Sequence, residues 1–470
     1  MRLRRPSYSS SHRIGQEKRM SEHLDVLVRG GLVVTAQGIA RADVGVRNGK
    51  VAEIAPQIAP ERVARTIDAS GKLVLPGVVD VHVHPVYLDD LGSVSVTAAH
   101  GGVTTMIHYA YVKPGERVIP TLEKFRNDGL ANSVLDFALH GGLFDVEHQL
   151  ADVPAAFKLG ITSFKVFMTY AKLKWMTNDY WLTALMDVVA KERGLVMVHA
   201  ENGLATDYLE DKYLREGRSP AEVFTAMCPA LLEAEAINRA MSLAQVTGCP
   251  LYVPHISAGA CLEPLRRARK MGWRVYGETC PQYLTLTEEM TLRMGPLAKI
   301  GPPLRTPQDN AALWQGLADG TLVAVASDHA PKSKRREDDF FQSPFGSPQI
   351  ETMLTMIYHA GVNGGKISLP RLVQVMSETP AKLFGLYPQK GTLQVGSDAD
   401  LVILDPTRTH TLSASNQNSH AGYTLYEGRE VTGAPVLTMQ RGEVIIEDGR
   451  LVAQPGRTRF LPTNTSHLYG

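Results

Sequence analysis

Residues 77–84 read GVVDVHVH, an apolar run that ends in two histidines. It is the first of eight apolar runs that alternate with stretches of helical character. The other seven are VTTMIHYA (103–110), SVLDFALH (133–140), ITSFKVFM (161–168), LVMVHA (195–200), LYVPHI (251–256), WRVYGET (273–279) and LVAVASD (322–328). Short buried strands that alternate with helices are typical of a parallel sheet. Eight such units predict a TIM-type (β/α)8 barrel, whose functional groups lie at the carboxyl ends of the strands.

The main alternative is a doubly wound open sheet. That fold normally carries a glycine-rich phosphate loop after its first strand. No G-x-G-x-x-G motif or P-loop follows any of the eight runs, so the sequence favours the barrel.

Both ends of the chain have a different pattern. Short alternating apolar runs broken by glycines, such as LDVLVRGGLVVT (24–35) and VLTMQRGEVIIEDGRLV (436–452), indicate antiparallel hairpins. We expect these two distant segments to build one smaller β-sandwich domain. The predicted domains are a β-sandwich over 22–74 and 390–456 and a barrel over 75–389.

Two terminal segments fall outside these domains. Residues 1–21 are basic and serine-rich without an apolar core, which predicts a disordered arm rather than a secretory signal. A translation start at Met20 and a transit peptide are the alternatives. Residues 457–470 have no periodicity, and we expect this C-terminal tail to be ordered only if it docks on a neighbouring chain.

Composition excludes several classes of function. The 470 residues carry 49 Lys and Arg against 48 Asp and Glu, a net charge of +1, so nothing favours nucleic acid or an anionic membrane as a partner. The sequence contains no run of about 18 apolar residues, so it predicts no membrane span. The four cysteines form no C-x-x-C pair and no disulfide framework. We expect a cytoplasmic protein with a small-molecule partner.

Five side chains at the strand ends suggest a metal centre. His82 and His84 end the first run two residues apart, so their imidazoles point to the same side of a strand. His199, His255 and Asp328 stand at the ends of the fifth, sixth and eighth runs. Imidazole and carboxylate groups suit Zn²⁺ and similar ions, which makes this set a candidate ligand cluster.

Lys165 lies inside the fourth apolar run, where an unpaired ammonium is costly to bury. It could extend to the barrel rim or form an ion pair with Asp328. We favour the alternative in which burial lowers its pKa, the neutral amine captures CO₂, and the carbamate bridges two metal ions.

Five motifs occur in a characteristic order: GVVDVHVHP (77–85), SFKVFMTY (163–170), VMVHAENG (196–203), YVPHISA (252–258) and VASDHAP (325–331). Over residues 23 to about 455 the chain thereby resembles the cyclic-amidohydrolase branch of the amidohydrolase superfamily, which includes hydantoinase, dihydropyrimidinase, allantoinase and dihydroorotase. The resemblance implies two divalent ions, with zinc expected and manganese or cobalt as alternatives. It implies that one ion binds His82, His84 and Asp328, the other His199 and His255, and that carboxylated Lys165 is shared. It also implies a homo-oligomer, a tetramer or a dimer.

The resemblance implies a mechanism as well. A hydroxide that bridges the two metals would attack a carbonyl carbon and open a C–N amide bond of a cyclic amide or imide. Asp328 would accept the proton of the hydroxide and deliver it to the departing nitrogen. Tyr170 matches the hydantoinase tyrosine whose hydroxyl stabilises the oxyanion; the alternative is a packed loop aromatic.

The substrate is less clearly indicated. Most motifs resemble hydantoinases and dihydropyrimidinases, which predicts a hydantoin or dihydropyrimidine-like ring, whereas GETCPQYLTLT (277–287) looks more like allantoinase. Gly301 and Phe345 stand where dihydropyrimidinases usually have Ser and Asn, positions that hold the ring through main-chain contacts. We therefore expect Tyr170, Gly301 and Phe345 to contact substrate, with Phe345 as an extra apolar wall. Allantoinase-type or dihydroorotase-type hydrolysis is the alternative, and a catalytically dead scaffold is a third.

Several other residues have more than one possible role. Arg305 is a candidate for binding a substrate carboxylate, and the basic run at 332–336 could attract an anion or be a solvated loop. Trp175 could line the mouth or pack on a helix. We interpret His108, His140 and His329 as structural groups or as partners that support the metal ligands, and we do not expect Cys280 to be a nucleophile.

Overall fold

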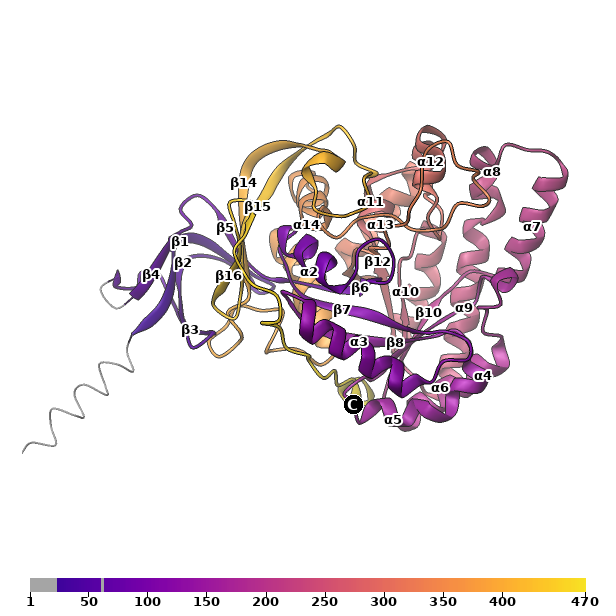
Figure 1. Cartoon of the computed structure of the whole chain (residues 1–470), viewed down its shortest axis with the longest axis horizontal. Helices are drawn as coiled ribbons and strands as arrows, with labels where there is room; N and C mark the ends of the chain where they lie inside the picture. Colours follow the sequence, from indigo (N-terminus) through magenta and orange to yellow (C-terminus); the bar gives the residue numbers. More distant parts are fainter. Residues whose placement is uncertain (1–22, 61–62) are drawn as a thin grey trace, which may run out of the picture.

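The structure of the protein is a computed structural model that describes residues 23–60 and 63–470. The expected N-terminal arm, residues 1–21, lies outside the described residues. Within the described part, the chain forms a parallel barrel with a separate mixed sheet beside it (Figure 1). None of the described helices is long and apolar enough to cross a membrane.

The barrel confirms the predicted fold. Among the described residues its sheet has eight strands, each parallel to the next and arranged in the order of the sequence. They are β6 (Val78–Val83), β7 (Val103–Val112), β8 (Asp136–Leu143), β9 (Ser163–Phe167), β10 (Leu195–His199), β11 (Leu251–Val253), β12 (Val275–Thr279) and β13 (Leu322–Val325). The first and last strands meet just beyond β13, where the His84 N–H donates to the His329 carbonyl at 3.0 Å.

Two strands are shorter than the sequence predicts. The strands predicted over 251–256 and 322–328 already end at Val253 and Val325. Farther on, the chain takes positive φ angles of 44° at His255 and 52° at Asp328. Because such a conformation breaks strand geometry and is rare for these residue types, both side chains project from loops just past the strands.

Helices surround the barrel, and α6 shows how the sequence specifies them. The Asn178 side chain accepts a hydrogen bond from the Trp181 N–H and caps the helix, and Leu182, Leu185 and Val189 face inward at helical spacing. The α-helices are α2 (Leu91–His100), α3 (Val118–Asn132), α4 (Val146–Gln149), α5 (Val153–Phe157), α6 (Asp179–Lys191), α7 (Gly203–Arg215), α8 (Pro220–Met227), α9 (Ala230–Thr247), α10 (Leu262–Lys270), α11 (Pro281–Thr285), α12 (Glu288–Met294), α13 (Pro307–Asp319), α14 (Met353–Ile357), α15 (Leu369–Val373) and α16 (Thr379–Leu383).

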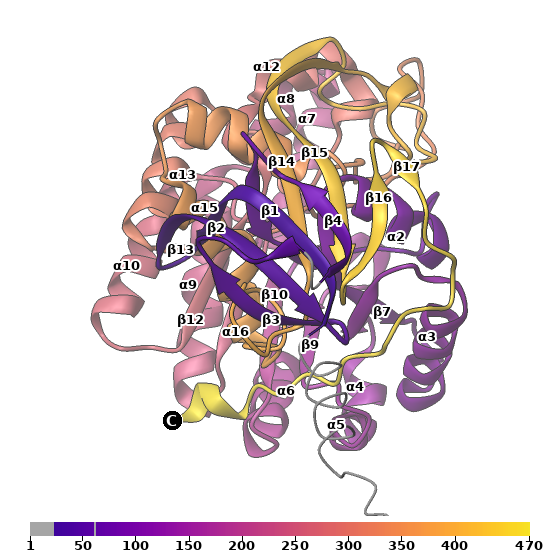
Figure 2. The same cartoon turned by 90° about the vertical axis from the view of Figure 1, so that its left-hand side faces the viewer.

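The two chain ends build one mixed sheet, seen face on in Figure 2. Its strands are β1 (Leu24–Thr35), β2 (Gly38–Arg47), β3 (Lys50–Ala55), β4 (Val63–Asp68), β5 (Leu73–Pro76), β14 (Leu401–Leu412), β15 (Arg429–Gln440), β16 (Glu443–Glu447) and β17 (Arg450–Leu451). Val44 of β2 and Met439 of β15 are not on neighbouring strands, yet they share one buried apolar cluster. The expected sandwich is thus one continuous sheet that curls around its own core. We propose that this sheet and the barrel are the two domains, with the limits predicted above.

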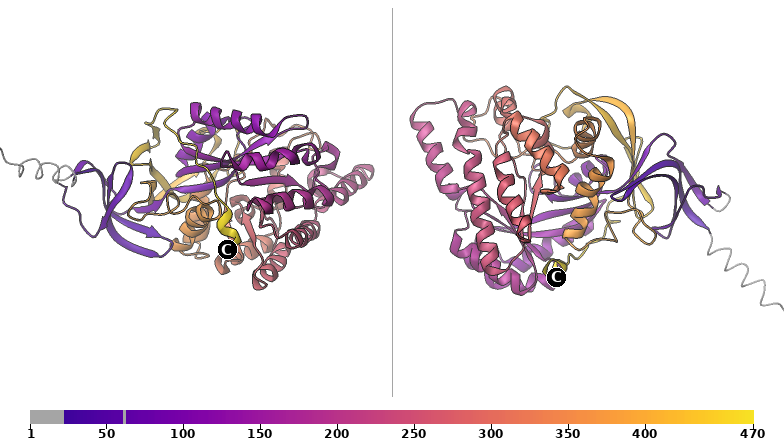
Figure 3. Two further views of the ribbon diagram at one scale, coloured as in Figure 1. Left: turned by 90° about the horizontal axis from the view of Figure 1, so that it is seen from below. Right: turned by 180° about the vertical axis from the view of Figure 1, so that it is seen from behind.

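The C-terminal tail corrects one expectation. It is ordered against its own barrel rather than a neighbouring chain, as the end of the chain shows in Figure 3. The Leu461 N–H donates to the Phe137 carbonyl at 2.7 Å, and the Thr463 N–H donates to the Gly160 carbonyl at 2.8 Å. Leu461 is buried, which supplies an apolar anchor that periodicity does not reveal. Since Phe137 and Gly160 lie near the start of β8 and before β9, the tail covers the amino end of the barrel.

Candidate metal centre

Three of the predicted ligands meet at the carboxyl end of the barrel. His82 is the fifth residue of β6 and His84 follows its end, so both imidazoles face the same side. Nε2 of His82 lies 3.1 Å from Oδ1 of Asp328, and Nε2 of His84 lies 3.0 Å from the same oxygen. The candidate ligand atoms of the three residues all lie within 4.8 Å of one another.

The other three predicted ligands lie beside this trio. Nζ of Lys165, on β9, is 3.5 Å from Nε2 of His255. The ring centroids of His199 and His255 are 4.5 Å apart, and those of His82 and His255 are 5.2 Å apart. All six residues therefore belong to one cluster, brought together from strands β6, β9 and β10 and from the loops after β11 and β13.

Lys165 is enclosed by the barrel. Its side chain is 1% exposed, and its ammonium lies over the rings of Tyr109 and Phe167. Burial lowers the pKa of Lys165 to about 8, although the charge of Asp328 opposes the shift. No ion pair with Asp328 forms within the described part of the chain, so that alternative is not supported.

The charge states of His84, His255 and Asp328 suit a cation. Burial lowers the pKa of His84 to about 3 and that of His255 well below its usual value. Burial opposes ionisation of Asp328, but the neighbouring His82 and His84 hold the pKa of its carboxyl well below the usual range. Neutral imidazole and ionised carboxylate are the forms that bind metal ions.

One orphaned atom tests the fit of a metal ion directly. Nε2 of His82 is buried and, although it lies 3.1 Å from Oδ1 of Asp328, it makes no hydrogen bond within the described residues. A buried imidazole nitrogen without a partner is costly unless it has another ligand. The His-His-Asp trio therefore fits a divalent metal ion.

Glu278, at the end of β12, is a residue that the sequence analysis missed. Its carboxylate lies 2.7 Å from Nδ1 of His82, and it accepts hydrogen bonds from the Tyr252 hydroxyl at 2.7 Å and the His255 N–H at 3.0 Å. Because an ionised carboxylate can only accept, Nδ1 of His82 carries the proton and Nε2 is left free as a ligand. A glutamate at the end of the seventh apolar run was the available signal.

Two further partners of the ligands were also missed. The Tyr111 hydroxyl lies 2.6 Å from Nδ1 of His84, and Oε2 of Glu201 lies 2.7 Å from Nε2 of His199. Such contacts orient the imidazole rings. Glu201 is part of the HAENG motif, but Tyr111 lies within β7, one residue beyond the predicted run 103–110, and no motif marks it.

The three expected substrate contacts lie together on the His199 side of the cluster. Tyr170 has a left-handed φ of 66°, and its ring centroid lies 5.2 Å from that of His199 and 5.7 Å from that of Phe345. A β-carbon on Gly301 would lie 3.0 Å from the Tyr170 hydroxyl oxygen and 3.2 Å from Cδ1 of Phe345. Trp175 extends this aromatic group, with its ring 6.1 Å from that of Tyr170.

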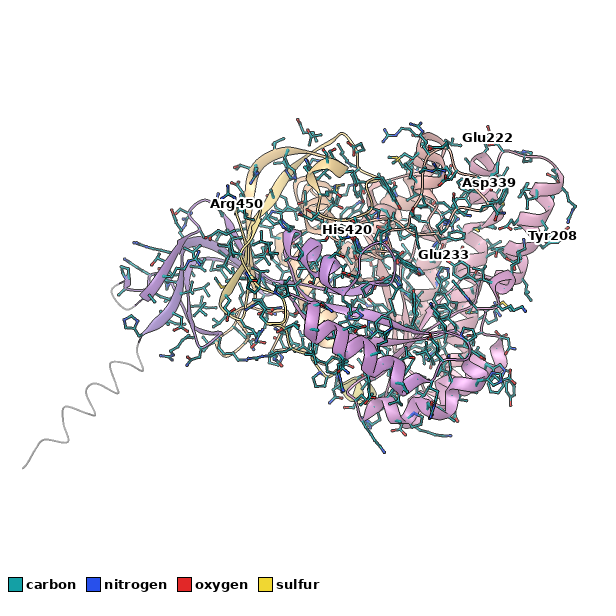
Figure 4. The ribbon with its side chains drawn as sticks, in the orientation of Figure 1. Tyr208, Glu222, Glu233, Asp339, His420 and Arg450 are labelled. Atoms are coloured by element: carbon teal, nitrogen blue, oxygen red, sulfur yellow. The ribbon has the colours of Figure 1, made fainter. Side chains whose placement is uncertain are left out.

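Arg305 does not lie open to a substrate. It is 1% exposed, its guanidinium pairs with Glu233 at 2.9 Å, and it donates to the Ser257 hydroxyl at 2.9 Å. Glu233 belongs to α9 and is labelled in Figure 4. The structure therefore corrects the suggestion that Arg305 binds a substrate carboxylate.

The strand-end residues that the sequence does not predict as ligands are all buried. His140 contacts the Ser163 hydroxyl at 2.6 Å, and His329 pairs with Asp89 at 2.9 Å. His108 is fully buried and stacks on Phe137. Cys280 is buried, and burial raises the pKa of its thiol well above the usual value, which opposes a role as nucleophile.

The comparisons with known proteins agree with this architecture. The model of the amidohydrolase family matches residues 73–445, and the chain belongs to that family. The model of the urease alpha-subunit N-terminal domain matches residues 9–72. The chain is 38% identical to a D-hydantoinase of Ralstonia pickettii, over 93% of this chain and 98% of that protein. It is also 38% identical to an L-hydantoinase of Paenarthrobacter aurescens, with 93% and 98% covered. A solved D-hydantoinase structure superimposes with a TM-score of 0.90 at 37% identity, over 94% of this chain and 100% of that one.

Proposed function

We propose that this protein is a metal-dependent hydrolase that opens the C–N amide bond of a cyclic amide or imide, a hydantoin or dihydropyrimidine-like ring. The observation that carries the proposal is the meeting of His82, His84 and Asp328 in one buried trio. The hydantoinase relatives, which match nearly the whole chain, support the substrate class.

We assign two divalent ions to the site, zinc first, with manganese or cobalt as alternatives. His82, His84 and Asp328 would hold one ion and His199 and His255 the other, with Lys165 shared as its carbamate. When bound, the ions would supply Lewis acidity toward the amide carbonyl and the attacking water. The lowered pKa of Lys165 supports the carbamate, because only the neutral amine reacts with CO₂, with release of a proton.

The chain's own residues then have distinct roles. Asp328 takes a proton from the attacking water and delivers it to the departing ring nitrogen, as base and then acid. The Tyr170 hydroxyl donates to the carbonyl oxygen as negative charge develops there. The Tyr170 hydroxyl makes no hydrogen bond to any described residue, so it is free to donate to substrate. Gly301 and Phe345 hold the ring amides through their main-chain groups.

Assembly and compartment complete the proposal. We place the protein in the cytoplasm, which the four free cysteines support. We expect it to form a homotetramer or homodimer. On α7, Leu204 is 64% exposed, and Tyr208, which is labelled in Figure 4, is 61% exposed. Their exposure supports an interface at this helix.

The test is ring opening by metal-loaded protein. Hydantoin, dihydrouracil, allantoin and dihydroorotate are compared under one condition, and the metal content is measured by mass spectrometry. We expect hydantoin or dihydrouracil to be opened fastest, with close to two ions per chain. Activity on none of the four would overturn the proposed function, and a metal-free protein would point to a scaffold.

A further inference from the structure

The basic run that follows Asp328 contains one ammonium without an acceptor. Lys334 is buried and donates to the carbonyls of Leu297, Lys299 and Gly346 at 2.7 to 3.1 Å. Arg335 pairs with Asp338, and Arg336 donates to the Arg293 carbonyl. These three cations thus hold the loop in place. The ammonium of Lys332 has no hydrogen bond and no ion pair within residues 23–60 and 63–470.

Lys332 lies at the rim of the candidate metal centre. Its Nζ is 2.8 Å from the centroid of the Tyr87 ring, and that ring is 6.3 Å from the ring of His84. Tyr87 is also hydrogen-bonded to Tyr111, whose hydroxyl contacts His84. Backbone contact with the Tyr423 hydroxyl anchors Lys332. One aromatic ring therefore separates this ammonium from a predicted ligand.

The surroundings of Lys332 leave its charge uncompensated. Burial lowers the pKa of Lys332 to about 7, and no carboxylate in the described chain offsets this shift. The Tyr87 ring offers only a cation–π contact. A partly buried ammonium gains most from an ionised acceptor, because charge-assisted hydrogen bonds are the stronger ones.

We propose that Lys332 is a specificity-determining residue that binds a carboxylate on the substituent of the ring substrate. The inference rests on the proposed function. Lys332 lies over Tyr87 and makes no hydrogen bond or ion pair with His84 or Asp328 within the described residues, so it is placed to reach a substituent rather than the scissile bond. The mouth thus carries a cation on the His84 side and the aromatic group of Tyr170 and Phe345 on the His199 side.

The experiment compares two substrates that differ only in charge. Hydantoin-5-acetic acid and its carboxamide have nearly the same shape, and unsubstituted hydantoin reports on the basal reaction. For the wild-type protein we expect kcat/KM for the acid to exceed that for the carboxamide about tenfold, since charge-assisted hydrogen bonds are stronger than neutral ones. Lys332→Met should abolish this preference and leave the carboxamide and hydantoin unchanged. Lys332→Arg should retain it.

Controls separate this inference from the proposed function. Lys366→Met removes another lysine, one that lies over Trp314 on a different part of the barrel, and should change nothing. Equal losses on all three substrates in Lys332→Met, or no preference for the acid in the wild-type protein, would overturn the role of Lys332. Failure to open hydantoin contradicts the proposed function instead. In that case the dissociation constants of the acid and the carboxamide are measured by calorimetry. Equal dissociation constants would overturn the role of Lys332.

Discussion

The Nζ of Lys165 lies 3.5 Å from Nε2 of His255, and this contact is the only hydrogen bond of the Lys165 side chain among the described residues. Burial lowers the pKa of both groups, and each charge would further disfavour the other. Two adjacent bases that both tend to lose their protons suit a cationic centre. They do not suit a structural ion pair.

Lys165→Ala therefore tests the shared ligand. We expect loss of bound metal and a fall in activity of at least about 100-fold, because even residues that only orient metal ligands contribute 10–100-fold. Metal content by mass spectrometry and hydantoin opening are the measurements. Lys191→Ala, which alters an exposed lysine paired with Asp187, is the control. Full metal content and activity in Lys165→Ala would exclude a bridging carbamate.

Glu278→Gln tests the orientation of His82. The amide can donate as well as accept, so it no longer fixes the proton on Nδ1 of His82. We expect metal affinity or activity to fall about 10–100-fold. Metal titration with a chelator in competition measures the affinity. Tyr252→Phe removes another hydrogen bond to Glu278 and should have a much smaller effect.

Tyr170→Phe separates transition-state stabilisation from folding. We expect kcat to fall about 100- to 1,000-fold, the usual cost of losing one oxyanion donor. Metal content and thermal stability should stay the same, because the hydroxyl bonds to no described residue. Steady-state kinetics and a melting curve measure both. An unchanged kcat would show that Tyr170 is a packed loop aromatic and does not stabilise the oxyanion.

Gly301 and Phe345 should behave as a coupled pair. A side chain in Gly301→Ser would crowd the Phe345 ring and the Tyr170 hydroxyl, so we expect a clear loss of kcat/KM. Phe345→Asn removes the ring and should restore part of that loss in the double variant. A double-mutant cycle on hydantoin measures the coupling, and strictly additive effects would show that the two positions act independently.

Lys390→Met tests the contact between the barrel and the loop that leads into β14. Lys390 is 1% exposed, and its Nζ lies 2.7 Å from Asp136 of the barrel, 3.0 Å from Asp398 and 2.7 Å from Asp400. Removal of the cation leaves Asp400 without an ion-pair partner among the described residues, and Asp136 and Asp398 keep only Arg441 and Lys50. This should lower the free energy of unfolding by about 3–5 kcal/mol. Lys50→Met breaks a pair with Asp398 from a side chain that is 43% exposed and should cost less than about 1 kcal/mol. Denaturant unfolding compares the two, and equal losses would contradict the prediction.

Much of the site was predictable from strand periodicity. His82 and His84 face one side because strand side chains alternate, and a lysine inside an apolar strand marks a buried amine. What periodicity does not contain is the partner of each polar group. The sequence does not show that Arg305 pairs with Glu233, 72 residues away, and is therefore not free to bind substrate. In the sequence Glu278 is an ordinary strand residue, and only the structure shows that its carboxylate contacts His82.

The sequence by itself determined the parallel barrel, the sheet built from both chain ends, and the six residues that gather at the strand ends. These follow from local rules, because hydrophobic period and strand-end position act over a few residues. Only the tertiary structure decided which charges are compensated. In the folded chain Arg305 and Lys334 make internal contacts, and the tail packs against the amino end of its own barrel. Lys332 lies beside Tyr87 without an ion pair in the described residues. Such outcomes depend on groups far apart in the chain, whose burial and pairing exist only once the barrel has closed.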